Sequence, residues 1–321
     1  MKRIIALFLV VVATGILLAK VTAPSQTGRA GDGSSFSTRT YPLADFTTLD
    51  VSNVVKVIYT QGDSYSVKLT GRTDWLDLME VTAKGGTLKV QAKKTKKFNN
   101  VKKKDQPDGR HNFILHLTAP CLQNINLSGV SEFEGKQLTP DWLAVRLEGV
   151  STFKVDAVEC ANLNISLNGV SKADVGNIQC QNKFDVNVNG SSKTDIQQLK
   201  AKDVHVNISG ASKVNLPQFS QGEMAVFSVN GASTLTLAAE VSKKLQIGLS
   251  GASKGELTFK GGRLRTACTG ASKLNADINC THIEANCDGA SKTTFSGTAD
   301  NVEIDRSGVA VNIDTSRLNQ F

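Results

Sequence analysis

A dense run of basic side chains between residues 93 and 110 is the part of this sequence best suited to binding a ligand. Its cations are Lys93, Lys94, Lys96, Lys97, Lys102, Lys103, Lys104 and Arg110. Only Asp105 and Asp108 oppose them, so the run carries a net charge of +6 out of the formal +8 of the chain. Such a run can attract an anionic glycan or the phosphates of lipopolysaccharide. The simpler interpretation, which the sequence favours, is a solvated insertion between two strands. Nucleic acid is not an expected partner, because Phe98 is the one aromatic residue in the run that can stack on bases.

A second set of lysines recurs three residues after a repeated glycine. Six of nine copies carry it: Lys172, Lys193, Lys213, Lys254, Lys273 and Lys292. The strand alternation described below points these side chains outward. Like charges stacked about 4.8 Å apart repel by roughly 0.9 kcal/mol per pair in water. Acidic residues two positions further on, such as Asp174 and Asp195, can offset that repulsion. We therefore expect a charge-balanced surface, and a ligand-binding stripe is the alternative.

A serine stands two residues after each of the nine repeated glycines, from Ser131 to Ser291. Nucleophilic catalysis needs one activated serine, whereas these nine are equivalent by position. If the side chains turn inward, they can bind backbone groups or the serine of the next repeat. The repetition therefore indicates a structural role.

The six cysteines follow the same repeat. Cys268 and Cys287 share one inward position in adjacent repeats, and Cys160 and Cys180 nearly share another. Disulfides between adjacent repeats and buried free thiols are both compatible with this spacing. The sequence contains no Cys-x-x-Cys or His-x-x-x-His pair, and its four histidines are scattered. It therefore predicts neither a metal site nor a cofactor.

These side chains must be positioned by a repeated unit of 19 to 21 residues. The tripeptide Gly-(Val/Ala/Ser)-Ser occurs nine times, starting at Gly129, Gly149, Gly169, Gly190, Gly210, Gly231, Gly251, Gly270 and Gly289. A degraded tenth copy begins at Gly308. Positions two and four residues before each glycine are apolar in most copies, with polar or small residues between them. This period-2 alternation is typical of half-buried strands, and the regular period indicates a solenoid.

One repeat therefore holds a strand, a tight glycine corner, a second strand and a looser return. About 20 residues at roughly 3.3 Å each give a coil with three short sides, as in one rung of a parallel β-helix. Leucine-rich repeats have a similar period, but their Leu-x-x-Leu-x-Leu-x-x-Asn pattern is absent. We predict an all-β solenoid of about ten rungs over residues 119–321.

The N-terminal part divides into three segments. Residues 1–23 read as an export signal with Lys2 and Arg3 before an apolar run; cleavage after Ala19 or Ala23 and an uncleaved anchor are open. Membrane contact is expected through this segment only. Residues 24–40, rich in Gly, Ser and Thr, are expected to form a flexible leader. Residues 41–118 lack the repeat but keep strand signals, and they are expected to be a degenerate β cap of the solenoid.

The chain resembles the head GIN domain family. The resemblance is carried by residues 46–63, by Val67 to Gly71, by Gly86 to Val90 and by the Gly-(Val/Ala)-Ser rungs. It covers the chain from about Tyr41 onward. It implies a right-handed β-helix in the envelope of Gram-negative bacteria, with a predicted role as an autotransporter adhesin. It brings no catalytic residues.

The leading hypothesis is a non-enzymatic exported protein of the periplasm, outer-membrane surface or extracellular space. Its rigid face would bind a glycan or another envelope component. A polysaccharide lyase or hydrolase is one alternative, because parallel β-helices support such chemistry, but those sites need clustered carboxylates. A purely structural envelope protein is the other alternative. Ligand identity and oligomeric state are not determined by the sequence.

Overall fold

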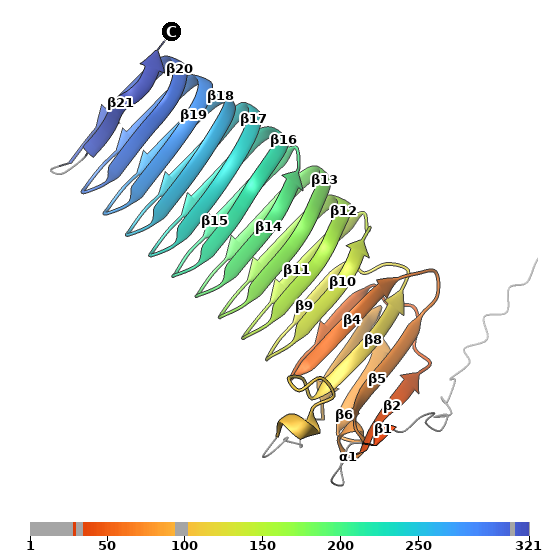
Figure 1. Cartoon of the computed structure of the whole chain (residues 1–321). Coiled ribbons are helices and arrows are strands. Elements are labelled where there is room, and N and C mark those ends of the chain that lie inside the picture. The colour runs from red at the N-terminus through yellow and green to blue at the C-terminus, as the bar shows by residue number, and fades with distance from the viewer. Residues whose placement is uncertain (1–27, 30–34, 94–101, 309–311, 321) are drawn as a thin grey trace, which may run out of the picture.

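The structure, a computed structural model, describes residues 28–29, 35–93, 102–308 and 312–320. The signal segment 1–23, most of the leader, and Lys94, Lys96 and Lys97 lie outside these residues. The described chain forms a rod in which strands stack from the N-terminal cap to the C-terminus (Figure 1). The predicted β-solenoid of about ten turns is therefore confirmed. Within the described residues, no helix has the length and apolar character needed to span a membrane.

The repeat region consists of parallel strands that pair from one rung to the next, with register shifts in some rungs, such as between Cys160 and Asn162. They are β9 (Asn124–Leu127), β10 (Glu132–Leu138), β11 (Trp142–Leu147), β12 (Thr152–Leu167), β13 (Lys172–Val188), β14 (Lys193–Lys200), β15 (Asp203–Ile208), β16 (Lys213–Val229), β17 (Thr234–Leu249), β18 (Lys254–Cys268), β19 (Lys273–Cys287), β20 (Lys292–Arg306) and β21 (Asn312–Gln320).

Most rungs are formed by one continuous strand. The sequence pattern instead predicts two strands, followed by a looser segment that returns the chain to the next rung. In β12 the inward–outward alternation breaks at Asp156–Ala157 and again at Ala161–Asn162, where neither residue is buried. These two bends and the glycine corner divide a rung into three sides. We call them the first, second and third side, in chain order after the corner. The ladder continues through the bends because neighbouring rungs bend at equivalent positions and keep pairing.

The core is a set of columns made by the inward residues of successive rungs. The positions two residues before each corner glycine, from Leu127 to Cys287, are all buried, as the alternation predicts. The positions six residues after the glycine, such as Val155, Val175 and Leu237, are buried as well. Each rung therefore covers the apolar face of its neighbours, and the solenoid is stabilised by contacts between adjacent rungs.

The repeated glycine is required by the backbone of the corner. From Gly129 to Gly289 its φ lies between +71° and +83°, a region that L-residues rarely adopt. A Cβ atom at Gly210 would lie 2.3 Å from the carbonyl oxygen of Gly190 in the preceding rung. Asn53 occupies the same column one rung earlier, with a φ of 82°. Asparagine tolerates this conformation better than most residues, so the cap contains a corner without glycine.

The corner serines are buried, and most bind as predicted. Ser131, Ser151 and Ser171 each donate to the carbonyl oxygen three residues earlier, at 2.8 Å. The hydroxyls of the next three serines also accept from the backbone N–H of the serine in the preceding rung, at 3.2 to 3.3 Å. The hydroxyls of Ser253, Ser272 and Ser291 have no hydrogen-bond partner in the described chain.

The cysteine columns are confirmed as well. Cys160 pairs with Cys180 and Cys268 with Cys287 in the parallel ladder. All six cysteines are free thiols, and the Cys160 and Cys180 Sγ atoms lie 3.5 Å apart in the core. Of the two alternatives that the spacing leaves open, the structure has the buried thiols.

The N-terminal cap contains β1 (Gly28–Arg29), β2 (Ser35–Tyr41), β3 (Thr48–Val51), β4 (Val55–Gln61), β5 (Ser66–Arg72), α1 (Thr73–Leu76), β6 (Met79–Lys84), β7 (Thr87–Ala92), η1 (Lys103–Asp105) and β8 (Phe113–Ala119). Strands β3 and β4 form a rung between β9/β10 on one side and β7/β8 on the other. The cap thus contains two coil-like rungs. The β3/β4 rung comes first in the chain, yet it lies between the β7/β8 rung and the repeat region. Strands β2, β5 and β6 pair antiparallel and lie outside the coil.

The expected flexible leader, residues 24–40, is wrong for residues 35–40, which belong to strand β2. Residues 36–41 pair antiparallel with β5, and β1 pairs with β2, so strand structure is present well before Tyr41. The strand is rich in Ser and Thr and lies near the edge of the sheet, where little apolar surface is needed. Because the strand is mostly polar, its sequence lacks the apolar residues by which the other strands were predicted.

Candidate functional site

The basic run occupies a corner of the rod. Residues 93 and 102–112, the described residues between β7 and β8, stand where other rungs have the short glycine corner, and we call them the corner insertion. The backbone N–H of Asn112 donates to the carbonyl oxygen of Val54, next to the Asn53 corner, at 2.9 Å. Figure 1 accordingly shows the yellow loop that carries η1 at the same edge as the tight corners of the rod.

The described cations of the corner insertion point away from the core. Lys102, Lys103, Lys104 and Arg110 are exposed around η1. Lys93 differs from them, because its Nζ donates to the carbonyl oxygen of Asp77 at 2.7 Å and so ties the start of the insertion to the cap. The sequence-predicted basic residues therefore divide into an exposed group and one anchoring lysine, as far as the structure describes them.

The two acidic residues of the run hold the insertion in place. Asp105 is buried; its Oδ1 accepts from Arg72 at 3.1 Å and its Oδ2 from the backbone N–H of Lys102 at 3.0 Å. These bonds lower the pKa of Asp105, the Lys102 N–H having the larger effect. Arg72 also pairs with Asp74, and its guanidinium lies 4.6 Å from the centre of the Trp75 ring. Asp105 and Asp74 thus both bind Arg72, which ties the insertion to the cap.

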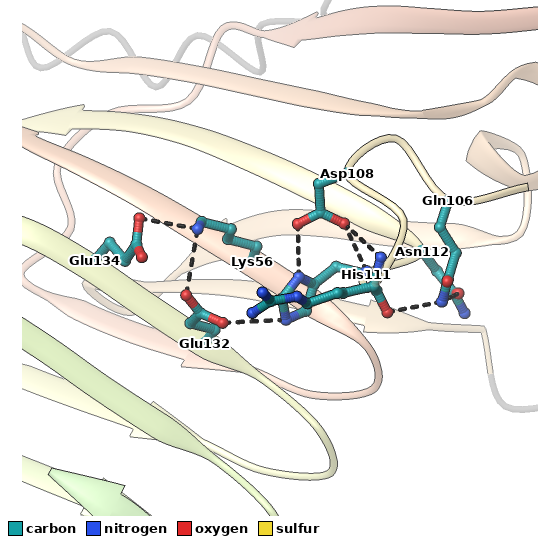
Figure 2. Close-up of polar contacts among 8 residues, drawn as sticks. Lys56, Gln106, Asp108, His111, Asn112, Glu132 and Glu134 are labelled. Carbon is teal, nitrogen blue, oxygen red and sulfur yellow. Dashed lines mark hydrogen bonds and ion pairs between the residues drawn. The ribbon is translucent and has the colours of Figure 1, made fainter. Parts of the chain in front are cut away.

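The other acid, Asp108, begins a chain of charged side chains that runs onto the first side of the rod (Figure 2). His111 is buried between two carboxylates: its Nδ1 lies 2.8 Å from Asp108 Oδ2 and its Nε2 lies 3.4 Å from Glu132 Oε2. Glu132 Oε1 accepts from Lys56 Nζ at 3.2 Å, and Lys56 Nζ also lies 2.9 Å from Glu134 Oε2. The insertion is thereby bound to β4 and β10.

Contacts within this chain of side chains stabilise the ionised forms of Lys56, Glu134 and Asp108. Burial of Lys56 opposes its charge, but hydrogen bonds from its ammonium to Glu134 and Glu132 raise its pKa overall. Lys56 in turn lowers the pKa of Glu134. Burial also opposes ionisation of Asp108, yet the backbone N–H groups of His111 and Arg110 and the His111 ring bring its pKa to about 2. Lys56 and Glu134 therefore form an ion pair, and Asp108 is an anion held by hydrogen bonds from residues 110 and 111.

We expect the hold on the corner insertion to weaken in acid. A carboxyl with a pKa of about 2 when folded and about 3.9 when unfolded stabilises the fold above about pH 4 and loses that effect as the pH falls toward 2. Because Asp108 is partly exposed, solvent screening should keep its contribution near about 1 kcal/mol. Asp108→Asn should therefore lower the free energy of unfolding by about that amount at pH 6, and by almost nothing at pH 2. Urea denaturation at both pH values measures this, and an equal loss at both would contradict it.

The lysine ladder is present as a column on the first side. Lys172, Lys193 and Lys213 are direct register partners, as are Lys254, Lys273 and Lys292. Ion pairs to the acid two residues on occur in two rungs, between Lys172 and Asp174 at 3.0 Å and between Lys193 and Asp195 at 2.7 Å. The column thus meets acids on the same face, as a charge-balanced surface requires, and in the structure it is not joined to the corner insertion.

The sequence pattern does not identify the His111 network. Its members come from β4, from the corner insertion and from β10, and the pairing of these segments is not visible in the repeat. One signal was available: Glu132 stands at the position where six of nine rungs carry lysine. Glu132 departs from the column because Lys56 of the adjacent rung supplies the cation. Within the described residues, no group of three or more His, Cys, Asp or Glu side chains is placed to hold a metal ion.

Comparison with known proteins identifies a matching family and a solved structure of similar fold. Residues 45–218 and 227–319 match the family model described as "Putative auto-transporter adhesin, head GIN domain". Solved structures of putative adhesins from Parabacteroides distasonis, Parabacteroides merdae and Bacteroides fragilis resemble the chain with TM-scores of 0.50, 0.48 and 0.40. Their sequence identities are 16%, 16% and 17%; the matches cover 87%, 86% and 87% of this chain and 96%, 95% and 96% of theirs. No curated protein matches the chain.

Proposed function

Because the chain belongs to the head GIN domain family of auto-transporter adhesins, we propose that it is a non-enzymatic adhesin of the cell envelope that binds an anionic glycan or lipopolysaccharide through its corner insertion. The family name supports an exported protein of the envelope or cell surface, and so does the basic and apolar start of the sequence. The choice of ligand rests on the charges of the insertion, which the family name does not specify.

One observation carries the choice of site. The acids of the corner insertion are turned into the fold, where Asp105 meets Arg72 and Asp108 meets His111. Lys102, Lys103 and Arg110 remain exposed, and none of them has an ion-pair partner in the described chain. The insertion therefore presents positive charge on a loop that is anchored by the buried Asp105 and by the partly exposed Asp108. Positive potential on a fixed surface favours phosphate, sulfate or carboxylate groups.

The test is a binding measurement with a charge-matched control. We expect Lys102→Gln/Lys103→Gln/Arg110→Gln to bind lipopolysaccharide vesicles or polyuronate oligosaccharides at least about tenfold more weakly than the wild type. At an anionic surface each basic residue contributes about 1 kcal/mol, and salt screens part of it. Lys213→Gln/Lys254→Gln/Lys273→Gln removes the same charge from the ladder and should bind like the wild type.

Sedimentation with vesicles, at low and physiological salt, measures both variants. Equal weakening in both would show a nonspecific charge effect and contradict the assigned site. Failure of the wild type to bind any of these anions would reject an anionic ligand and favour the purely structural alternative.

A further inference from the structure

The first side of the rod carries a hollow at the end of that side that lies farther from the corner insertion. It has a volume of about 670 Å³ and lies over β4, β10 and β12. Ile58 lines it together with the polar residues Gln61, Glu134, Lys136, Lys154 and Asp156. Along β4, it is separated from the corner by about five residues, or roughly 17 Å of extended chain. The hollow is thus distinct from the anionic site proposed above, and its volume is typical of a small-molecule site.

The hollow coincides with a departure from the regular rungs. Strand β10 ends at Leu138 and β11 begins at Trp142, whereas β12, β13 and β16 to β20 run through the same bend as continuous strands. The intervening segment is fixed to β4: Gln61 Nε2 donates to Thr139 Oγ1 at 2.6 Å, and the Thr139 N–H donates to Gln61 Oε1 at 3.0 Å. Irregular segments on a rigid repeat scaffold are where binding sites are found.

Three charged side chains of the hollow remain available to a ligand. Lys136, Lys154 and Asp156 form no ion pair within the described part of the chain. Lys154 contributes only at longer range, where its charge lowers the pKa of Glu134. Glu134 is bound to Lys56, which leaves its other carboxylate lone pairs as acceptors. Donors and acceptors therefore face the same solvent-filled space.

The balance of these groups selects the class of ligand. Two lysines and two carboxylates line the hollow, so their formal charges cancel. An anion would meet Glu134 and Asp156, and a cation would meet the lysines. A sugar hydroxyl can accept from an ammonium and donate to a carboxylate, and Ile58 offers an apolar contact for the carbon face of a sugar ring. We propose that the hollow binds an uncharged saccharide.

The test uses saturation-transfer difference NMR with the full chain and three neutral trisaccharides: maltotriose, mannotriose and N,N′,N″-triacetylchitotriose. We expect at least one to bind, with little change between low and physiological salt. Lys154→Gln/Asp156→Asn, which nearly preserves side-chain size, should weaken binding at least about tenfold, since hydrogen bonds to two charged groups are lost. Lys254→Gln/Glu256→Gln alters the same kind of pair on a later rung and should leave binding unchanged.

Several outcomes would overturn the inference. These are no binding of any neutral trisaccharide, equal binding by the Lys154/Asp156 variant and the wild type, and an effect of that variant confined to charged oligosaccharides. The inference and the proposed function can fail separately. Lys102→Gln/Lys103→Gln/Arg110→Gln should retain neutral saccharide binding, and Lys154→Gln/Asp156→Asn should retain binding to lipopolysaccharide vesicles.

Discussion

Replacing Gly210 by alanine should lower the free energy of unfolding by about 3 kcal/mol or more and the melting temperature by about 10 °C. Gly210 has a φ of +81°, which costs alanine about 1 to 2 kcal/mol. The added Cβ would lie 2.3 Å from the carbonyl oxygen of Gly190. That oxygen already accepts from the backbone N–H of Ala211, so the rungs would have to separate, at a further cost of about 1 to 3 kcal/mol.

A second glycine provides the control for this experiment. Gly248 lies within β17 with ordinary strand φ, and a Cβ there would approach no atom closer than 4.0 Å. Gly248→Ala should therefore be neutral or slightly stabilising, because it restricts the unfolded chain. Urea denaturation followed by circular dichroism compares the two variants. Similar unfolding curves for both would mean that the corner tolerates a side chain and that the glycine repeat has another origin.

Phe153→Ala should lower the free energy of unfolding by about 3 to 5 kcal/mol, because the Phe153 ring is fully buried at the junction of the cap and the rungs. Its ring centre lies 5.3 Å from that of Phe133, which in turn lies 5.7 Å from Tyr59. Gly135, beside them, leaves room for the rings to meet. The stack packs beneath β4, β10 and β12, the three strands that carry the His111 network and the hollow.

Phe153→Leu separates loss of volume from loss of the aromatic ring. It retains most of the apolar volume and should cost less than about 1.5 kcal/mol. Denaturation by urea gives both values, and saccharide binding by the leucine variant checks that the hollow survives. If alanine cost no more than leucine, the stack would not join the cap to the rungs as its geometry indicates.

The regular rungs were predictable from the sequence because each one contacts only its neighbours. The period of about 20 residues places Leu147, Leu167 and Val188 in one column, and the structure buries all three. In a parallel stack, the same spacing that shapes one rung also aligns it with the next. The glycine corner, the inward serine and the outward lysine follow from the same local pattern.

The candidate sites were less predictable, because they lie where the repeat breaks down. Asn53 stands at the position of the corner glycine, so the glycine repeat does not identify the first rung of the cap. Val55 and Phe113 are adjacent in space through β4 and β8, although nearly 60 residues separate them in the chain. A local repeat in the sequence gives no information on pairing between segments so far apart in the chain. The basic residues of the corner insertion were visible in the sequence, but the burial of Asp105 and the contact of Asp108 with His111 were not.

The amino-acid sequence alone was thus sufficient for the solenoid, its rung length and its buried columns, because those depend on short-range spacing. The order of the cap rungs, the His111 network and the hollow arise from segments that meet across long stretches of chain. Their contacts depend on how far a strand bends or stops, as β10 does at Leu138, and backbone geometry of that kind is set by packing between rungs.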